Sequence, residues 1–434
     1  MKNVLDNLGS KAWRFFKIGI MNNLKFNRES LARSVKKYTD DYHEYFLEWL
    51  FEKPIVTSSE TIDDLKAAGL VLNKMIKYVS SNFTEKGFDK RMPISEKVKE
   101  ILDVFSQKDT YDLGTFRTDF VFDTELKPKF IEITCQFSLN AFFQAAVYNR
   151  YSQECSEKHG LEDYRLEEYD AFMDFMTEKI GDHDSICVIK GWDSIQSSKF
   201  FTPIFRNAGL EVKEISYKDV WENRDFIKKS LVINECMLNE IETLSKEELE
   251  LLASAKLIND YRNIFIAHDK RFFSILQDHA VQKQILSEEE MSLLNRFLID
   301  THQCGSDSYD KEEVLNNKDA WILKHISLGR SREIFAGLEL NEQQWKEKIE
   351  SINPADYIIQ KWVPQLQFKG KVNGVEHNDH LTGTLLYFDE SYFGLGLFRM
   401  SSHIVANKVD NRNIFPLVVK EKEMIKKVDS VLSF

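Results

Sequence analysis

Apolar residues recur at three- and four-residue spacing through much of the first hundred positions. Residues 30–51 and 61–83 both carry this pattern, which is typical of amphipathic helices. The same spacing returns in residues 138–153 and 163–180. We therefore predict an N-terminal helical region over residues 1–105 and further helices after the segment that interrupts this pattern.

The interrupting segment, residues 116–137, reads FRTDFVFDTELKPKFIEITCQF and alternates apolar with polar positions on both sides of a turn-like DTELKP. Alternation with a period of two predicts two β-strands joined as a hairpin. If the turn occupies residues 123–128, Phe122 faces Lys129. We assign this hairpin and the helices after it to residues 106–182.

In this register four polar side chains share one face of the hairpin. Asp119 lies opposite Glu132, and Arg117 lies opposite Thr134. Opposed residues bring their Cβ atoms to about 5 Å, so two facing carboxylates need a cation, a shared proton or solvent between them. A solvent-exposed sheet face is one explanation. The other is a magnesium ion held by carboxylates and nucleotide phosphates, with Arg117 beside it for a phosphoryl or carboxyl oxygen.

The pattern changes again over residues 183–260. Short β-branched runs at 185–190, 211–216 and 230–235 are separated by helical segments. Strands that alternate with helices predict a small parallel α/β unit. The turn after its first strand reads GWDS and lacks the glycine fingerprint of a dinucleotide site.

The remainder, residues 261–434, contains both the helical spacing of three and four residues and the alternation typical of strands. We predict a helix over 268–286, a strand ending near 325, an extended segment over 357–368 and two more strands within 381–405. The fold class expected for the whole chain is therefore α+β (α/β).

Composition narrows the function classes. Among 434 residues, 58 Lys and Arg face 70 Asp and Glu, and the net charge of -12 disfavours nonspecific binding of nucleic acid. Five scattered cysteines without a CxxC motif argue against a disulfide framework or a zinc cluster and favour a cytoplasmic protein. No signal-peptide pattern or apolar stretch of about 20 residues is present, so we expect no membrane association.

Three cationic residues in the C-terminal half are candidates for phosphate binding. Lys270 lies at the start of a predicted helix, and Lys324 ends an apolar strand before a loop that contains Gly329 and Gly337. Arg399 follows two glycines at a strand end. Each is also consistent with an ordinary solvated side chain.

Taken together and in this order, these features resemble the circularly permuted ATP-grasp ligases, typified by the synthetase domain of glutathionylspermidine synthase. FRTDF followed by FIEIT is similar to the family's RxDF strand and ExN strand, and the resemblance extends in scattered blocks over about residues 110–420. It implies an ATP-grasp fold in permuted order with a small α/β domain. It also implies ATP-dependent joining of a carboxylate to an amine, through an acyl phosphate, with release of ADP and phosphate.

The resemblance also implies roles for the hairpin residues. Asp119 and Glu132 would bind Mg²⁺, with Thr134 at the position of the family's Asn. Arg117 would stabilise the reacting carbonyl and phosphate oxygens, and Arg399 would face the phosphate or acyl group. The partners would be a small-molecule or peptide carboxylate and an amine acceptor.

The nucleotide-binding residues follow in the same way. Lys270 and Lys324 would hold ATP phosphates, and the segment with Gln360, Lys361 and Val363 would meet the adenine. The oligomeric state is left open by the sequence.

Two alternatives remain. One is a nucleotide-binding module without turnover, because Thr134 replaces an amide oxygen with a weaker hydroxyl ligand. The loop after Lys324 also contains fewer glycines than is usual in the family, and its two arginines could add phosphate contacts. The other is a metal hydrolase that uses His377 and His380, which we expect to lie in a loop without a third ligand.

Overall fold

The computed structural model describes most of the chain between residues 49 and 419. The described residues are 18–20, 31–33, 49–108, 111–146, 149, 151, 167–191, 197–329, 331–365, 367–406, 410, 412–419 and 430–431. The predicted helix over 30–51 therefore lies mostly outside the described residues, as does the end of the one predicted over 138–153.

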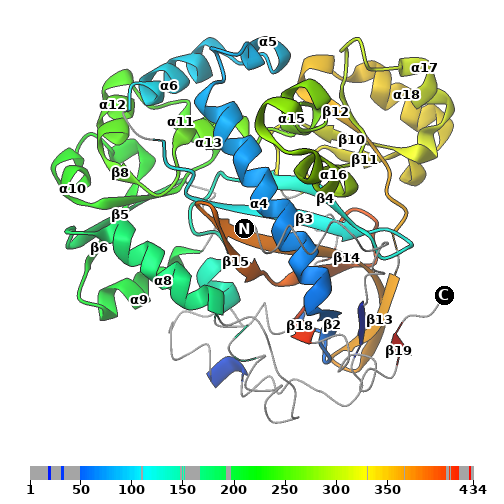
Figure 1. Cartoon of the computed structure of the whole chain (residues 1–434), viewed down its shortest axis with the longest axis horizontal. Helices are drawn as coiled ribbons and strands as arrows, with labels where there is room; N and C mark the ends of the chain where they lie inside the picture. The colour runs from blue at the N-terminus through cyan, green and yellow to red at the C-terminus, as the bar shows by residue number, and fades with distance from the viewer. Residues whose placement is uncertain are drawn as a thin grey trace.

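The central element is a seven-stranded antiparallel sheet (Figure 1). Its main path runs β17 (Arg412–Ile414), β16 (Phe398–Ser401), β14 (Val375–Phe388), β3 (Thr115–Phe122) and β4 (Pro128–Thr134), and β13 (Gln367–Val372) and β15 (Ser391–Leu395) also pair with β14. Helix α4 (Ser59–Ser81) runs across this sheet (Figure 1). Buried Tyr387 of β14 packs under Gly69 of α4 and donates a 3.2 Å hydrogen bond to the Leu65 carbonyl.

A second antiparallel sheet has the order β11 (Ile334–Ala336), β10 (Trp321–His325), β12 (Tyr357–Lys361) and β9 (Thr301–Gln303). Helices α17 (Lys311–Asn316) and α18 (Glu342–Ser351) complete this lobe (Figure 1). Fully buried Trp345 joins the two helices, since its indole N–H donates to the Val314 carbonyl at 3.0 Å. The lobe therefore has a core of its own beside the central sheet.

A parallel sheet forms the α/β unit that the alternating pattern predicted. Its order is β6 (Glu211–Ser216), β5 (Ser185–Lys190), β7 (Leu231–Glu235) and β8 (Lys256–Leu257), with α8 (Glu167–Ile180), α9 (Ser198–Asn207), α10 (Arg224–Lys229), α11 (Leu238–Ile241) and α12 (Lys246–Ser254) around it. The Glu235 carboxylate accepts the Ser198 N–H at 2.9 Å at the start of α9. An internal carboxylate thus occupies the place where a dinucleotide-binding unit holds phosphate.

The N-terminal region is not helical throughout. Helices α4, α5 (Phe88–Arg91) and α6 (Glu96–Ser106) follow the apolar spacing, but β1 (Ile18–Ile20) and β2 (Ile55–Ser58) are strands. They form a small sheet of order β18 (Pro416–Val419), β2, β1 and β19 (Ser430–Val431). Segments from the two ends of the chain therefore share one sheet, which local periodicity does not predict.

Three further expectations for the C-terminal half need correction. The helix predicted over 268–286 is divided into α14 (Phe272–Leu276) and α15 (His279–Ile285), because Asp278 caps a new helix start with its side chain. Residues 381–405 contain parts of three strands, not two. The expected loop with His377 and His380 is part of β14.

The other described elements connect these layers. They are α13 (Tyr261–Ile266), α16 (Glu288–Phe297), and the 3-10 turns η1 (Tyr217–Asp219), η2 (Lys318–Ala320), η3 (Gly337–Glu339) and η4 (Pro354–Asp356). Mixed α/β structure with several sheets agrees with the α+β class that we expected. None of the described helices combines the length and the hydrophobicity needed to span a membrane.

Candidate functional site

A cavity of about 260 Å³ lies between the central sheet and the β9–β12 sheet, and we call it the charged cavity. Strands β3, β4, β14 and β16 line it from one sheet, and β10, β11 and β12 line it from the other. All of the site residues predicted from the sequence line this cavity: Arg117, Asp119, Glu132, Thr134, Lys270, Lys324, Gln360, Lys361, Val363 and Arg399. Segments up to 280 residues apart in the chain thus meet in one place, although the role of each residue stays a prediction.

The hairpin register at the site is the one that alternation predicts. Asp119 pairs with Glu132, and Arg117 pairs with Thr134, across β3 and β4. Strands with a two-residue period place all four side chains on the same face. That face lines the charged cavity and is not a solvated outer surface.

The predicted pairing of Phe122 with Lys129 is wrong. A β-bulge follows Asp119, so Ile131 has no partner on β3 and Phe122 pairs with Pro128. An extra residue in one strand shifts every later pair by one position. The carbonyl of Ile131 instead accepts a 3.3 Å hydrogen bond from Lys324 Nζ on the other sheet. The bulge therefore links the two walls of the cavity.

Cations separate the two facing carboxylates. Buried Asp119 accepts hydrogen bonds from Arg117 Nε at 2.7 Å and Arg117 Nη2 at 3.2 Å, and it also binds Arg399 Nη2. Glu132 Oε1 lies 3.1 Å from Lys270 Nζ. Burial by itself raises the pKa of Glu132, but the charges of Lys270 and Arg117 outweigh it and lower the pKa below its ordinary value.

Lys270 is a buried residue, so the solvated alternative does not hold for it. Its side chain is 2% exposed, and Nζ donates to the Leu328 carbonyl at 3.0 Å in addition to its contact with Glu132. It lies in the turn between α13 and α14, not within the first turn of a long helix. The turn is fixed because the Lys270 N–H donates to the Ile326 carbonyl at 2.9 Å.

Lys324 is also buried, and a chain of hydrogen bonds positions it. Its Nζ donates to Gln360 Oε1 at 2.7 Å, and Gln360 Nε2 donates to Thr301 Oγ1 at 2.9 Å. Burial lowers the pKa of Lys324 to about 8, with Lys270 acting in the same direction and Glu132 and Asp119 against it. The Gln360 amide is thus occupied by two neighbours within the cavity wall.

His268 is a cavity residue that the sequence did not single out. It is 3% exposed, Nδ1 lies 3.2 Å from the Ile133 carbonyl, and Nε2 has no hydrogen-bond partner among the described residues. Burial, together with the charge of Lys270, lowers its pKa to about 4, so the imidazole is neutral at pH 7. A lone histidine two positions before Lys270 carries no spacing signal, which explains why it was missed.

An apolar cluster forms another part of the same cavity. Ile322, Ile334, Trp362, Ile404 and Val405 pack together and all line it. Six cationic side chains and two carboxylates also line the cavity, so its charge is net positive. A positive region beside an apolar one suits an anionic ligand with a flat apolar part.

The donor set fits a hard divalent cation only in part. Asp119, Glu132 and Thr134 provide the oxygen ligands that Mg²⁺ prefers. The described residues contain no group of three or more His, Cys, Asp or Glu side chains that would hold a metal. An ion here would therefore need further oxygen ligands from water or a phosphorylated substrate.

The same observation bears on the hydrolase alternative. His377 packs edge-on against Phe51, and His380 lies 3.2 Å from the Gln367 amide. No third ligand joins them in the described part of the chain. The two histidines therefore have structural neighbours and no metal-binding geometry.

The chain matches one family model over part of its length and several solved structures. The family model of the AnkG N-terminal domain matches residues 70–266, which include the hairpin but not Lys270 or Lys324. No curated protein matches the chain. Solved structures that match include one from Methylobacillus flagellatus KT, described as a "Putative gamma-glutamylcysteine synthetase". It is 12% identical, the alignment covers 81% of this chain and 88% of that one, and the TM-score is 0.37. A structural match with a TM-score below 0.5 assigns neither a fold nor a function to this chain.

Proposed function

We propose that this chain is an ATP-dependent ligase that joins a carboxylate to an amine through an acyl phosphate, with release of ADP and phosphate. The observation that carries the proposal is the charged cavity. Two opposed carboxylates, Asp119 and Glu132, meet two buried lysines, Lys270 and Lys324, beside an apolar cluster. Carboxylates for a metal, cations for phosphates and an apolar surface for a base are what a magnesium nucleotide requires.

In this proposal the apolar cluster holds the adenine and the buried lysines hold the phosphates. The Gln360 amide already binds Lys324 and Thr301. The Lys361 N–H donates to the Asp300 carbonyl at 2.9 Å, so recognition of the adenine edge falls to the Lys361 carbonyl and the Val363 N–H, and Gln360 acts by positioning Lys324.

Asp119 and Glu132 would hold Mg²⁺, with Thr134 as a weaker oxygen ligand. When bound, the ion would supply positive charge that offsets the negative charge of the phosphates. Asp119 is now paired with Arg117 and Arg399. A cation at Asp119 would release both guanidinium groups toward substrate oxygens, where Arg binds planar carboxylate and phosphate groups well.

The proposed reaction has two steps. A substrate carboxylate oxygen attacks the γ-phosphorus of ATP, an O–P bond forms, and the bond from the γ-phosphorus to the β,γ-bridging oxygen breaks as ADP leaves. An amine then attacks the acyl carbon and forms a C–N bond. The bond from the acyl carbon to the phosphate oxygen breaks, phosphate leaves, and the amine nitrogen loses a proton. Arg117 and Arg399 would stabilise the charge that develops on oxygen in both steps.

A second candidate is a nucleotide-binding module without turnover. It is favoured by Thr134 in the third ligand position and by the double occupation of Asp119 by arginines. Both candidates predict ATP binding, but the module alone predicts no ADP with any acceptor.

One assay set separates the two. The protein is incubated with Mg²⁺, ATP and pools of amino acids, peptides and polyamines, and ADP, AMP and product mass are measured. Substrate-dependent ADP with a new amide product supports the ligase, and ATP binding with no ADP in any pool supports the module. Failure to bind ATP, or release of AMP, would contradict both.

A further inference from the structure

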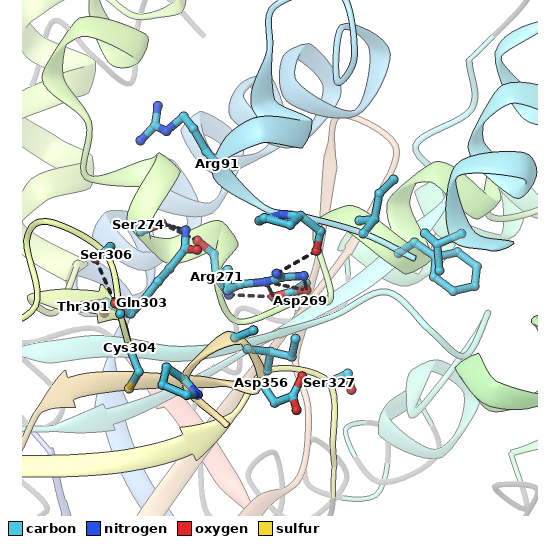
Figure 2. A pocket seen from close by; sticks show the side chains of 18 of the residues that line it. Arg91, Asp269, Arg271, Ser274, Thr301, Gln303, Cys304, Ser306, Ser327 and Asp356 are labelled. Carbon is cyan, nitrogen blue, oxygen red and sulfur yellow. Dashed lines mark hydrogen bonds and ion pairs between the residues drawn. The ribbon is translucent and has the colours of Figure 1, made fainter. Parts of the chain in front are cut away.

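A much larger cavity adjoins the charged cavity. It has a volume of about 1270 Å³, and we call it the large cavity (Figure 2). Three residues, Gln136, Met237 and Arg332, line both cavities. The two spaces are therefore neighbours that share part of their walls.

Lys270, to which we assign phosphate binding, is held by two residues that line the large cavity, Ile326 and Leu328. Lys270 is bonded through its N–H to the Ile326 carbonyl and through Nζ to the Leu328 carbonyl. Lys270 faces Glu132 in the charged cavity, whereas its chain neighbours Asp269 and Arg271 line the large cavity. Residues that line the large cavity are therefore direct chain neighbours of a residue in the proposed reaction centre.

The volume limits what the large cavity holds. Pockets for small molecules and cofactors are about 300–1000 Å³. At about 1270 Å³, the large cavity exceeds that range, although the charged cavity beside it already provides the space assigned to the nucleotide. A free amino acid or a short diamine would leave most of it filled with water.

Four of the nine Asp, Glu, Lys and Arg residues that line the large cavity form ion pairs with each other, and the other five carry charges of both signs: Lys90, Glu242, Asp307, Arg332 and Asp356. Arg271 Nη2 binds Asp269 Oδ2 at 2.7 Å, and Arg91 Nη1 lies 2.9 Å from Asp278 Oδ2. Arg271 also donates to the Pro93 carbonyl at 2.9 Å, so its charge is largely used within the wall. This arrangement does not favour a strongly charged ligand.

Neutral hydrogen-bonding groups make up much of the remaining lining. Gln303 Nε2 donates to Ser274 Oγ at 2.8 Å, and Ser306 lies in the following turn (Figure 2). Hydroxyl and amide groups both donate and accept, which matches the alternating N–H and C=O groups of a peptide backbone. The lining chemistry and the volume point to the same class of ligand.

We propose that the large cavity binds a polypeptide segment and that this segment is the second substrate of the ligase. Its reactive amine or carboxylate reaches the charged cavity past Gln136 and Met237. The catalytic part of this inference rests on the proposed function, whereas the binding part does not.

The binding part is tested on the full chain without ATP. A pool of fluorescein-labelled ten-residue peptides of randomised sequence is titrated with protein, and fluorescence anisotropy is measured. Asn239 and Asp307 are exposed residues that line the large cavity but not the charged cavity, so Asn239→Trp and Asp307→Trp narrow it. Each is expected to raise the peptide Kd at least tenfold. Asn207→Trp, an exposed helical position outside the cavities, is the matched control and is expected to leave it unchanged.

ATP binding is measured separately for the same three variants and is expected to remain within twofold of the wild type. Absence of peptide binding, or equal binding by the narrowed variants and the control, would overturn the inference. Displacement of the peptides by free amino acids or spermidine at equal concentration would overturn it as well. Absence of ATP binding in the wild-type protein would instead refute the proposed function. The peptide titration would then still test whether the large cavity binds a polypeptide.

Discussion

Lys324 and Gln360 form a hydrogen bond of 2.7 Å between two side chains that are almost completely buried. They lie on neighbouring strands, and the amide continues to Thr301 on a third. Lys324 Nζ also reaches the Ile131 carbonyl of the central sheet. One lysine therefore connects both walls of the charged cavity, and the Gln360 amide determines where its charge lies.

We expect Gln360→Ala to reduce both stability and nucleotide affinity. Removal of the amide leaves the buried Lys324 Nζ without its shortest hydrogen bond, and an unsatisfied buried polar group costs about 1–3 kcal/mol. Chemical denaturation and ATP titration would measure the two effects. Lys369→Ala is the control, because Lys369 is an exposed strand residue that does not line the charged cavity. Equal ATP affinity in Gln360→Ala and wild type would contradict a positioning role.

ATP binding is expected to weaken above pH 8. The pKa of Lys324 is lowered to about 8 in the ligand-free protein, so its cationic form is largely present at pH 7 and lost as the pH rises through 8. Phosphates favour the cation, so binding at higher pH requires proton uptake. The Kd should increase by about tenfold per pH unit above 8, since one pKa unit corresponds to about 1.36 kcal/mol. Calorimetry from pH 6.5 to 9.5 measures this directly.

Gln360→Glu provides the internal check on that profile. A carboxylate beside Lys324 favours its charged form, so the pH at which affinity begins to fall should move upward. In Lys324→Met the affinity should be low at every pH and the slope should disappear. A slope retained in Lys324→Met would assign the titration to another group.

The hairpin could be predicted from the sequence because its signal is local. Alternation alone gives the face shared by Arg117, Asp119, Glu132 and Thr134, but the pairing assumed at the turn was wrong by one residue, and a bulge restores the predicted pairing at the site. The bulge at Ile131 was missed, since its formation depends on packing and on the bond that its carbonyl accepts from the other sheet. The same local reasoning correctly located three of the four strands of the parallel sheet and missed the short β8.

Contacts between distant segments were outside the reach of local patterns. The pairing of Arg399 with Asp119 joins residues 280 positions apart, and nothing in either segment specifies the other. Burial of Lys270 likewise depends on the loop at Leu328 that folds over it. The large cavity is formed by segments from many parts of the chain, so only the folded structure reveals it. The motifs therefore indicated the candidate residues, and the fold provided their charge partners.

Asp119→Asn is expected to abolish turnover and retain the fold. It removes the carboxylate that pairs with Arg117 and Arg399, which are 17% and 22% exposed, so part of the loss is recovered by water. We expect a stability loss of about 1–3 kcal/mol, below the 3–5 kcal/mol typical of a fully buried pair. ATP without Mg²⁺ should bind more tightly, because the variant removes a negative charge from the cavity. Circular dichroism and ADP release, with Glu132→Gln measured in parallel, would check these outcomes. Near-normal turnover in both variants would refute the metal assignment.

The last prediction concerns Thr134, the position that distinguishes a working ligase from a nucleotide-binding module without turnover, which we call the silent module. Thr134→Asn introduces an amide oxygen on the cavity face, so the Mg²⁺ concentration needed for half-maximal ADP release should decrease, by up to about tenfold. Thr134→Val removes the hydroxyl at nearly constant volume and should increase that concentration. The ATP Kd measured without Mg²⁺ should be unchanged in both variants, which distinguishes an effect on the metal from a general disturbance of the cavity.

If Thr134→Asn creates turnover in a protein that otherwise only binds ATP, the natural chain is the silent module. If all three proteins turn over with the same Mg²⁺ dependence, Thr134 is not a ligand.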